Sequence, residues 1–249
     1  MADVILVVLD RPEAAAGLLA AAGCIARLTG SARVKALAAD PALRPIAECW
    51  ASEAGHAVQA ALSLDVVDAA GRLTEAVEQR GRRADIVVVS QPLPDDSKQA
   101  RETFRTALFQ TERPVLVVPP AWGSAFGRRV AIAWRDDERA IKAVMPALRF
   151  LGHADAVHLM TGVRAGAAKP AIPPAVPSVL IEHGINADLH VLPIGAAPFG
   201  VTLLEAAQAV GADMLVMGAY AHGKLRDAIL GGLTRHVLSH ATLPAFMRH

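Results

Sequence analysis

The sequence predicts an α/β protein made of two tandem units, each with a mainly parallel five-stranded sheet and helices on both faces. The first observation is a series of short, continuous apolar runs, which are typical of parallel strands buried on both faces. The second is that a charged turn and a helix-like stretch follow each run, so strands and helices alternate. Such alternation implies right-handed crossovers, which place helices on both faces of the sheet.

The two halves of the chain open in the same way. Their first strand-like runs are "DVILVVL" at 3–9 and "RVAIAW" at 129–134. A helical stretch follows each run and ends at a glycine, Gly30 or Gly152, and glycine is a common cap at the C-terminus of a helix. A second strand candidate comes next, "ARVKALAA" in the first half and "ADAVHLMTG" in the second.

The two halves also close in the same way. The segments "RRADIVVVSQ" at 82–91 and "VGADMLVMGA" at 210–219 share an Ala-Asp pair, an apolar run and a turn. Each half then ends in a strand that opens with proline, at 113–120 and 243–249. This internal repeat indicates two copies of one β/α unit.

The repeat divides the chain into two domains, residues 1–120 and 128–249. The segment "PPAWGSAFG" at 119–127 has the proline, glycine and serine expected of a linker. We expect the two domains to pack through their last strands, near 114–119 and 243–248, as a pseudo-dimer within one chain. The sequence leaves open whether the whole chain forms a homodimer.

The second copy is the easier of the two to divide into elements. Its strands are predicted near 129–134, 154–161, 187–193, 213–218 and 243–248. Its helices are predicted near 137–151, 174–184, 199–211 and 225–240. In the first copy, residues 41–62 are predicted to be helical, and "SLDVVDA" at 63–69 is either a short third strand or a loop.

The composition limits the classes of protein to consider. Apolar residues make up 53% of the chain and aromatic residues only 4%, which predicts an aliphatic core. The net charge of +1 gives no support for general nucleic-acid or membrane binding. The two cysteines, Cys24 and Cys49, lie in predicted helices outside any ligand cluster, which favours a reducing compartment. No segment approaches the roughly 20 apolar residues of a membrane helix, so we expect a soluble cytoplasmic protein.

The segment "GAYAHGKLRDAILGG" at 218–232 is the best candidate for a binding site. In an open parallel sheet, ligands bind beyond the carboxyl ends of the strands, and this segment directly follows the strand "DMLVM". Its glycines allow a close approach of the backbone to an anion, and the helix after it offers free N–H groups. The alternative is purely structural: the glycines make a tight turn and relieve packing.

The tandem unit and the segment "MGAYAHGKLRDAILGGLTRHVL" resemble the universal stress protein family, and in particular its tandem-domain bacterial members. The resemblance covers the whole chain and is stronger over 129–249 than over 1–120. It implies a Rossmann-like fold of the adenine nucleotide alpha hydrolase type. It also implies a stress-response regulatory protein, and nucleotide-binding members of the family carry G-x2-G-x9-G followed by Ser or Thr. On this chain that pattern begins at Gly218.

The chain departs from the family pattern at three positions. Ala221 stands at the second glycine, and its methyl group occupies space where backbone and phosphate may need to touch. Gly232 follows Gly231 at the Ser/Thr position and so lacks the hydroxyl, although Thr234 lies close by. Arg135 stands where the family has an Asp directed toward the ribose and adenine, with Asp136 or Asp137 as a possible substitute acceptor.

The resemblance implies that the ligand of the C-terminal domain is ATP, with or without Mg²⁺, or another adenine nucleotide. The residues expected to hold phosphates and ribose, to line the base pocket or to flank them are Ala133, Arg135, Leu159, Met217, Gly218, Ala221, His222, Gly223, Gly231, Gly232, Leu233 and Thr234. His222 either donates to a phosphate or caps the turn. The first copy keeps Asp10 but has "SQPLPDDSKQ" in place of the glycine segment, so we predict that it binds no nucleotide.

Other functions have less support in the sequence. His236 and His240 are one helical turn apart, but the sequence shows no third metal ligand at a helpful spacing, so a packed or solvated pair is the favoured interpretation. No nucleophile and base converge, so we predict a regulatory protein with at most weak ATPase activity. The alternative function is a nucleotide-free protein of the same fold that acts through dimerisation and partner binding.

Overall fold

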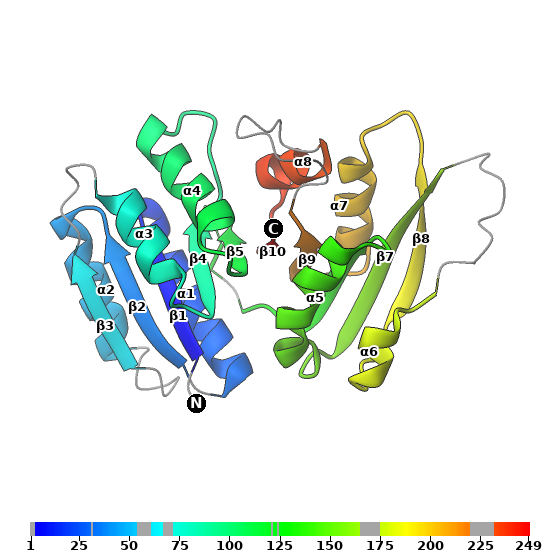
Figure 1. Ribbon diagram of the computed structural model, residues 1–249, viewed down its shortest axis with the longest axis horizontal. Helices are drawn as coiled ribbons and strands as arrows, with labels where there is room; N and C mark the ends of the chain where they lie inside the picture. Colours follow the sequence, from blue (N-terminus) through cyan, green and yellow to red (C-terminus); the bar gives the residue numbers. More distant parts are fainter. Residues whose placement is uncertain are drawn as a thin grey trace. The chain divides into compact units, whose positions relative to one another are not determined.

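The structure is a computed structural model that describes residues 3–30, 32–53, 61–66, 72–120, 122–123, 125–164, 175–219 and 232–249. The chain forms two compact units, Met1–Ala125 and Phe126–His249 (Figure 1). The division between them falls inside the predicted linker, 119–127.

The N-terminal unit is a parallel sheet in the order β3-β2-β1-β4-β5, and every described strand pair in it is parallel. Its strands are β1 (Asp3–Leu9), β2 (Ala32–Ala38), β3 (Ala61–Val66), β4 (Ile86–Ser90) and β5 (Val115–Val118). Its helices are α1 (Pro12–Thr29), the short 3-10 helix η1 (Pro41–Leu43), α2 (Arg44–Glu53), α3 (Leu73–Gly81) and α4 (Lys98–Gln110).

The C-terminal unit repeats this order as β10-β9-β6-β7-β8, again with parallel pairs. Its strands are β6 (Arg129–Trp134), β7 (Ala156–Arg164), β8 (Asp188–Ile194), β9 (Met214–Gly218) and β10 (Ala245–Arg248). Its described helices are α5 (Glu138–Leu151), α6 (Ser178–Glu182), α7 (Phe199–Ala209) and α8 (Gly232–His240). The predicted fold class, an α/β repeat with parallel sheets, is therefore confirmed.

Helices cover both faces of each sheet (Figure 1). In the N-terminal unit α1 and α2 pack together on one face, and α3 and α4 pack together on the other. In the C-terminal unit the corresponding pairs are α5 with α6 and α7 with α8. The central strands are buried on both faces, and the core between the layers is largely aliphatic, as the composition predicts.

Local sequence signals explain several helix ends. Ser97 caps α4 by accepting a hydrogen bond from the backbone N–H of Ala100. Gly30 ends α1 with φ of 80°, the left-handed conformation expected of a glycine cap. Gly152 ends α5, as predicted, and its backbone there is right-handed, with φ of −65°.

The helix predicted over 41–62 is wrong in its second part. A 3-10 turn and α2 occupy Pro41–Glu53, and residues 54–60 lie outside the described part of the chain. Ala61 and Leu62 belong to β3, where they pair with Arg33 and Val34 of β2. Pairing with β2 satisfies the backbone N–H and C=O groups of β3, and this tertiary contact outweighs the local helix propensity.

Another predicted helix is shorter in the structure. The helix predicted over 174–184 is reduced to Ser178–Glu182, and it starts directly after Pro177. The helix predicted over 225–240 is described only from Gly232 onward. Both cysteines lie in helices as predicted, but only Cys24 is buried as a small apolar residue, whereas Cys49 is exposed on α2.

The Ala-Asp pair that marks the repeat has the same task in both units. In the N-terminal unit the backbone N–H of Asp85 donates to the carbonyl of Val4, and its carboxylate accepts from the N–H of Val4 at 2.8 Å. In the C-terminal unit Asp213 donates to the carbonyl of Arg129. Its carboxylate accepts from the backbone N–H groups of Gly127, Arg128 and Arg129 at 2.8, 3.1 and 3.2 Å. Each aspartate thus joins the start of one central strand to the start of its neighbour.

Across the described residues, the helices are too short or too polar to cross a membrane.

We expect Asp213→Ala to lower the free energy of unfolding of the C-terminal unit by about 2 to 3 kcal/mol, because it removes a charged acceptor of three backbone N–H groups. The matched control is Asp155→Ala, which removes an exposed carboxylate paired with Arg128 at 2.6 Å. Exposed pairs contribute little, so this control should change stability by less than about 1 kcal/mol. Urea unfolding measures both variants, and equal losses would contradict the clamp assigned to Asp213.

Candidate functional site

The candidate site lies at the point in the C-terminal sheet where the order of strand addition reverses. From β6 the chain builds outward to β7 and β8, and it then returns to place β9 and β10 on the other side of β6. The carboxyl ends of β6 and β9 are therefore neighbours at the topological switch point, where ligands bind in open α/β sheets. Arg135 follows β6 at this edge, and Gly218 is the last residue of β9.

The strand registers show which predicted pocket residues share a face. Ala133 pairs with Met217 on one side and with Met160 on the other, so these three side chains point to the same face. Leu159 pairs with Ile132 and points to the opposite face. The structure thus brings Ala133 and Met217 together, but it places Met160 rather than Leu159 beside them.

Two glycines identify the helices that cover these faces. Gly162 lies two residues after Met160 on β7 and so on the same face of the sheet. A Cβ on Gly162 would come within 2.9 Å of the Phe199 ring of α7. The face of Ala133, Met217 and Met160 is therefore the face of α7 and its neighbour α8. A Cβ on Gly218 would instead meet the backbone of Arg139 in α5, on the other face.

The contact with α5 gives Gly218 a structural reason to be glycine. A Cβ at this position would lie 3.1 Å from the carbonyl oxygen of Arg139 and 3.2 Å from its carbonyl carbon. Backbone atoms in the first turn of a helix cannot move aside as easily as the end of a side chain. The packing role that the sequence analysis set against ligand binding is thus present at Gly218.

Among the described residues, the turn between β6 and α5 carries several charges at this edge. Asp137 caps α5, because its Oδ1 accepts from the backbone N–H groups of Arg139 and Ala140, at 3.1 Å each. Its Oδ2 lies 3.7 Å from Nε of Arg135 and 3.6 Å from a terminal nitrogen of Arg139. Asp137 is therefore already engaged as a cap, which leaves it less suited to replace the family's acceptor.

The positive charges of α5 also affect His249, the residue that follows β10. The pKa of His249 lies below its ordinary value, mainly because of burial and then because of the positive charges of Lys142 and Arg139. Lys142 also pairs with Glu138 one turn earlier in α5, at 3.0 Å.

The start of α8 supplies the remaining described part of the site. Gly232 is exposed, and a Cβ on it would meet no atom within 4 Å. Leu233 is half-buried and Thr234 is buried. Helix α8 is held close to α7, since a Cβ on Gly200 would lie 2.6 Å from Cβ of His236. The four remaining predicted residues, Ala221, His222, Gly223 and Gly231, lie outside the described residues.

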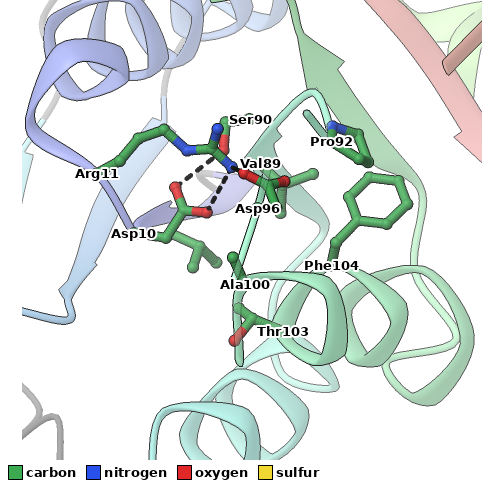
Figure 2. Close-up of a pocket in the computed structure, with 10 residues that line it drawn as sticks. Asp10, Arg11, Val89, Ser90, Pro92, Asp96, Ala100, Thr103 and Phe104 are labelled. Atoms are coloured by element: carbon green, nitrogen blue, oxygen red, sulfur yellow. Dashed lines mark hydrogen bonds and ion pairs between the residues drawn. The ribbon is translucent and has the colours of Figure 1, made fainter. Parts of the chain in front are cut away.

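The N-terminal unit fills the equivalent edge with its own side chains (Figure 2). A terminal nitrogen of Arg11 donates to Asp96 at 2.9 Å and to Asp10 at 3.3 Å, and Ser90 donates its hydroxyl to Asp10 at 2.9 Å. The side chains of Asp10, Arg11 and Asp96 are only 7–11% exposed. The space left beside them is about 10 Å³, roughly the room that one water molecule needs.

The ion pairs of Arg11 also hold the loop between β4 and α4. Asp96 accepts from Arg11 through Oδ1 and from the backbone N–H of Leu93 through Oδ2, at 2.8 Å. Burial by itself lowers the pKa of Arg11, but the carboxylates of Asp10 and Asp96 outweigh it and raise the pKa above its ordinary value. The guanidinium is thus a fixed cation at the carboxyl edge of β1 and β4. This role of Arg11 was not predicted from the sequence.

The two units carry opposite charges at the same position. Val4 and Arg129 are equivalent, because each exchanges backbone hydrogen bonds with the clamping aspartate of its unit. Asp10 follows Val4 by six residues, and Arg135 follows Arg129 by six residues, so Asp10 corresponds to Arg135. By the same count Arg11 corresponds to Asp136, and Ser90, the end of β4, corresponds to Gly218, the end of β9. The N-terminal unit therefore keeps the acid without glycines, and the C-terminal unit keeps the glycine without the acid.

Four of the described histidines form two pairs. The rings of His236 and His240 stack with their centroids 4.2 Å apart, and Nδ1 of His240 lies 3.0 Å from the carbonyl of His236. The second pair, which was not predicted from the sequence, joins β7 and β8: Nδ1 of His158 lies 3.2 Å from Nε2 of His190. Burial, followed by His190 and Arg129, lowers the pKa of His158 against an opposing effect of Asp188. Within the described ranges, no group of three side chains is placed to bind a metal.

Comparison with known proteins identifies the family that this chain resembles. Residues 197–247 match the model of the Universal stress protein family. A comparison with curated proteins gives no match. The family model confirms, for the C-terminal unit, the resemblance predicted from the sequence.

Solved structures extend the likeness of fold to nearly the whole chain. A universal stress protein from Archaeoglobus fulgidus DSM 4304 has a TM-score of 0.71 at 16% identity, over 99% of this chain and 96% of that chain. A functionally unknown protein from Pseudomonas aeruginosa PAO1 has a TM-score of 0.65 at 17% identity, over 99% of this chain and 92% of that chain. At these identities the likeness is one of fold.

We expect Gly218→Ala to lower the free energy of unfolding by about 1 to 2 kcal/mol, because the new methyl group presses on the backbone of Arg139. Gly232→Ala adds the same methyl group where a Cβ meets nothing within 4 Å, so it should be neutral or slightly stabilising. Chemical denaturation of both variants measures the difference. A neutral Gly218→Ala would show that contact with α5 does not explain this glycine.

We expect Arg11→Met to destabilise the N-terminal unit by about 2 to 4 kcal/mol, because it leaves Asp10 and Asp96 buried without their cation. Lys98→Met is the control, since Lys98 is 92% exposed and lies 3.9 Å from Glu102. Its loss should stay below about 0.5 kcal/mol. Thermal and urea unfolding measure both, and a loss no larger than that of the control would contradict the buried role of Arg11.

Proposed function

We propose that this chain is a tandem universal stress protein, a stress-response regulatory protein whose C-terminal unit binds ATP or another adenine nucleotide. The family match over 197–247 and the shared fold support this proposal. The nucleotide would lie at the carboxyl edge of β6 and β9, with its phosphates toward Gly218 and the start of α8. A cytoplasmic setting, the intrachain pseudo-dimer, dimerisation of the whole chain and the identity of protein partners stay predictions from the sequence.

One observation carries the proposal: the switch point between β6 and β9 is bordered by the exposed guanidinium of Arg135 and by the exposed Gly232, the first described residue of α8. Arg135 is 76% exposed at this edge, and Gly232 leaves space at the beginning of α8. Backbone N–H groups at the start of a helix favour phosphate, and guanidinium groups bind it through paired hydrogen bonds. Phosphate is thus the chemical group that the described residues fit best, and bound Mg²⁺ would neutralise part of the phosphate charge.

The described residues support binding and regulation rather than chemistry. At the edge of β6 the carboxylate of Asp137 is engaged in capping α5, so it is not available as a general base. We therefore propose at most weak ATPase activity. The regulatory signal would be the nucleotide-bound state itself, since a ligand that binds only the folded protein shifts its conformational equilibria.

We propose that the N-terminal unit binds no nucleotide. Arg11 already fills the equivalent crevice, and Asp10 and Asp96 would repel a phosphate that approached it. The two units would then divide the work, with the N-terminal unit serving as a structural partner of the C-terminal one.

A second function is favoured by the contact between Gly218 and α5. If this glycine is needed only for packing, and if Arg135 replaces the acceptor of the family, the site has lost its nucleotide. The chain would then be a nucleotide-free interaction protein of the same fold, acting through dimerisation and partner binding.

We expect adenine nucleotides to raise the melting temperature of the full-length chain. Binding to the folded state alone stabilises by about 2.7 kcal/mol when the ligand is at a hundredfold excess over its dissociation constant. A thermal-shift titration with Mg-ATP, ADP and AMP measures the effect. If no adenine nucleotide shifts the melting temperature at millimolar concentration, the nucleotide-binding proposal fails.

A double variant separates the two functions. Ala221→Gly together with Gly232→Ser restores the residues of the family pattern, and the structure shows open space for a side chain at Gly232. Binding by both the natural chain and the double variant supports a working site. Binding by the double variant alone shows that the natural site has lost its ligand, and it favours the interaction protein.

A further inference from the structure

We propose that the edge of β6 and β9 prefers an adenine nucleotide with an additional phosphate on its ribose, and that Arg135 sets this preference. The inference rests on the proposed nucleotide binding and names the class of nucleotide. Its basis is the position of Arg135 directly after β6, which pairs with β9, the exchange of charge relative to Asp10, and the exposure of the Arg135 side chain.

The first step concerns where the sugar would lie. The strands β6 and β9 are direct neighbours, and Ala133 pairs with Met217 one residue before the end of each strand. Neighbouring strands are about 4.8 Å apart. A nucleotide whose 5′-phosphates lie on the β9 and α8 side therefore places its ribose over the end of β6, where Arg135 follows the strand.

The second step is the comparison of the two units at this position. In the N-terminal unit Asp10 is 11% exposed and accepts a hydrogen bond from Ser90. In the C-terminal unit Arg135 takes the place of Asp10, Gly218 takes the place of Ser90, and Arg135 is 76% exposed. An inward-facing acceptor has thus become an accessible cation, and the hydroxyl that filled the edge is gone.

The third step is the balance of charge. Arg135 and Arg139 share a single carboxylate oxygen of Asp137, at 3.7 and 3.6 Å. These distances are longer than the roughly 2.7–2.9 Å of a strong hydrogen bond between charged groups. The other oxygen of Asp137 caps α5. Residues 135–142 carry three basic and three acidic side chains, so their charges balance. The exposed and weakly paired guanidinium of Arg135 is the group that an additional phosphate can reach.

The fourth step is the chemistry of recognition. A carboxylate accepts hydrogen bonds from ribose hydroxyls, whereas a guanidinium group matches the oxygens of a phosphate in pairs. In dinucleotide-binding α/β folds, an acidic residue binds the ribose hydroxyl, and an arginine accommodates a phosphate at the same place on the sugar. The exchange of acid for arginine predicts the same change of ligand here.

The test uses the full-length chain and three ligands that differ only on the ribose: AMP, adenosine 2′,5′-bisphosphate and adenosine 3′,5′-bisphosphate. We expect calorimetric titration at low salt to show one bisphosphate binding about 10- to 100-fold more tightly than AMP. Arg135→Gln should remove this preference, so that the variant binds AMP and the two bisphosphates with equal affinity. Arg128→Gln, which makes the same change of charge at the amino end of β6, should keep the preference.

Each outcome separates this inference from the proposed function. Equal affinities for AMP and both bisphosphates, or a preference that survives Arg135→Gln, would overturn the role of Arg135 while leaving nucleotide binding intact. A preference lost equally in Arg128→Gln would assign it to general charge and would also overturn the inference. Binding of none of the three ligands would remove the proposed nucleotide function itself.

Discussion

The pairing of two central strands, clamped at their amino ends by one aspartate, is the interaction on which each unit depends. Asp85 joins the starts of β1 and β4, and Asp213 joins the starts of β6 and β9. The clamp fixes the register of the strands that meet at the topological switch point. Because register propagates along a strand, it also determines which residues emerge together at the carboxyl edge, about five residues further on.

The two units share this frame and differ at the edge that it creates. In the N-terminal unit Asp10, Arg11 and Asp96 form a buried ionic cluster that leaves room for about one water molecule (Figure 2). In the C-terminal unit Arg135 is exposed, and Gly218 packs against α5. This difference, rather than the shared fold, is what separates their proposed roles.

Much of the architecture could be predicted because it follows from local patterns. Apolar runs and glycine or serine caps located most strands and helices, including β1 and β6 at their observed bounds. Residues 61–62 could not be assigned in this way, because their strand conformation depends on pairing with β2. The same limit applies to Leu159, since a position in the sequence does not reveal which face of the sheet a side chain occupies until the register is known.

The sequence by itself determined the repeat, the alternation of strands and helices, and the three departures from the family pattern at Arg135, Ala221 and Gly232. These are properties of residue order, and apolar periodicity and glycine spacing record them directly. Only the tertiary structure decided that Arg11 fills the N-terminal crevice, that Gly218 lies against α5, and that Arg135 replaces a buried acid. The reason is physical: these roles depend on distances between residues far apart in the chain, which the strand registers and the packing of helices on the sheet establish.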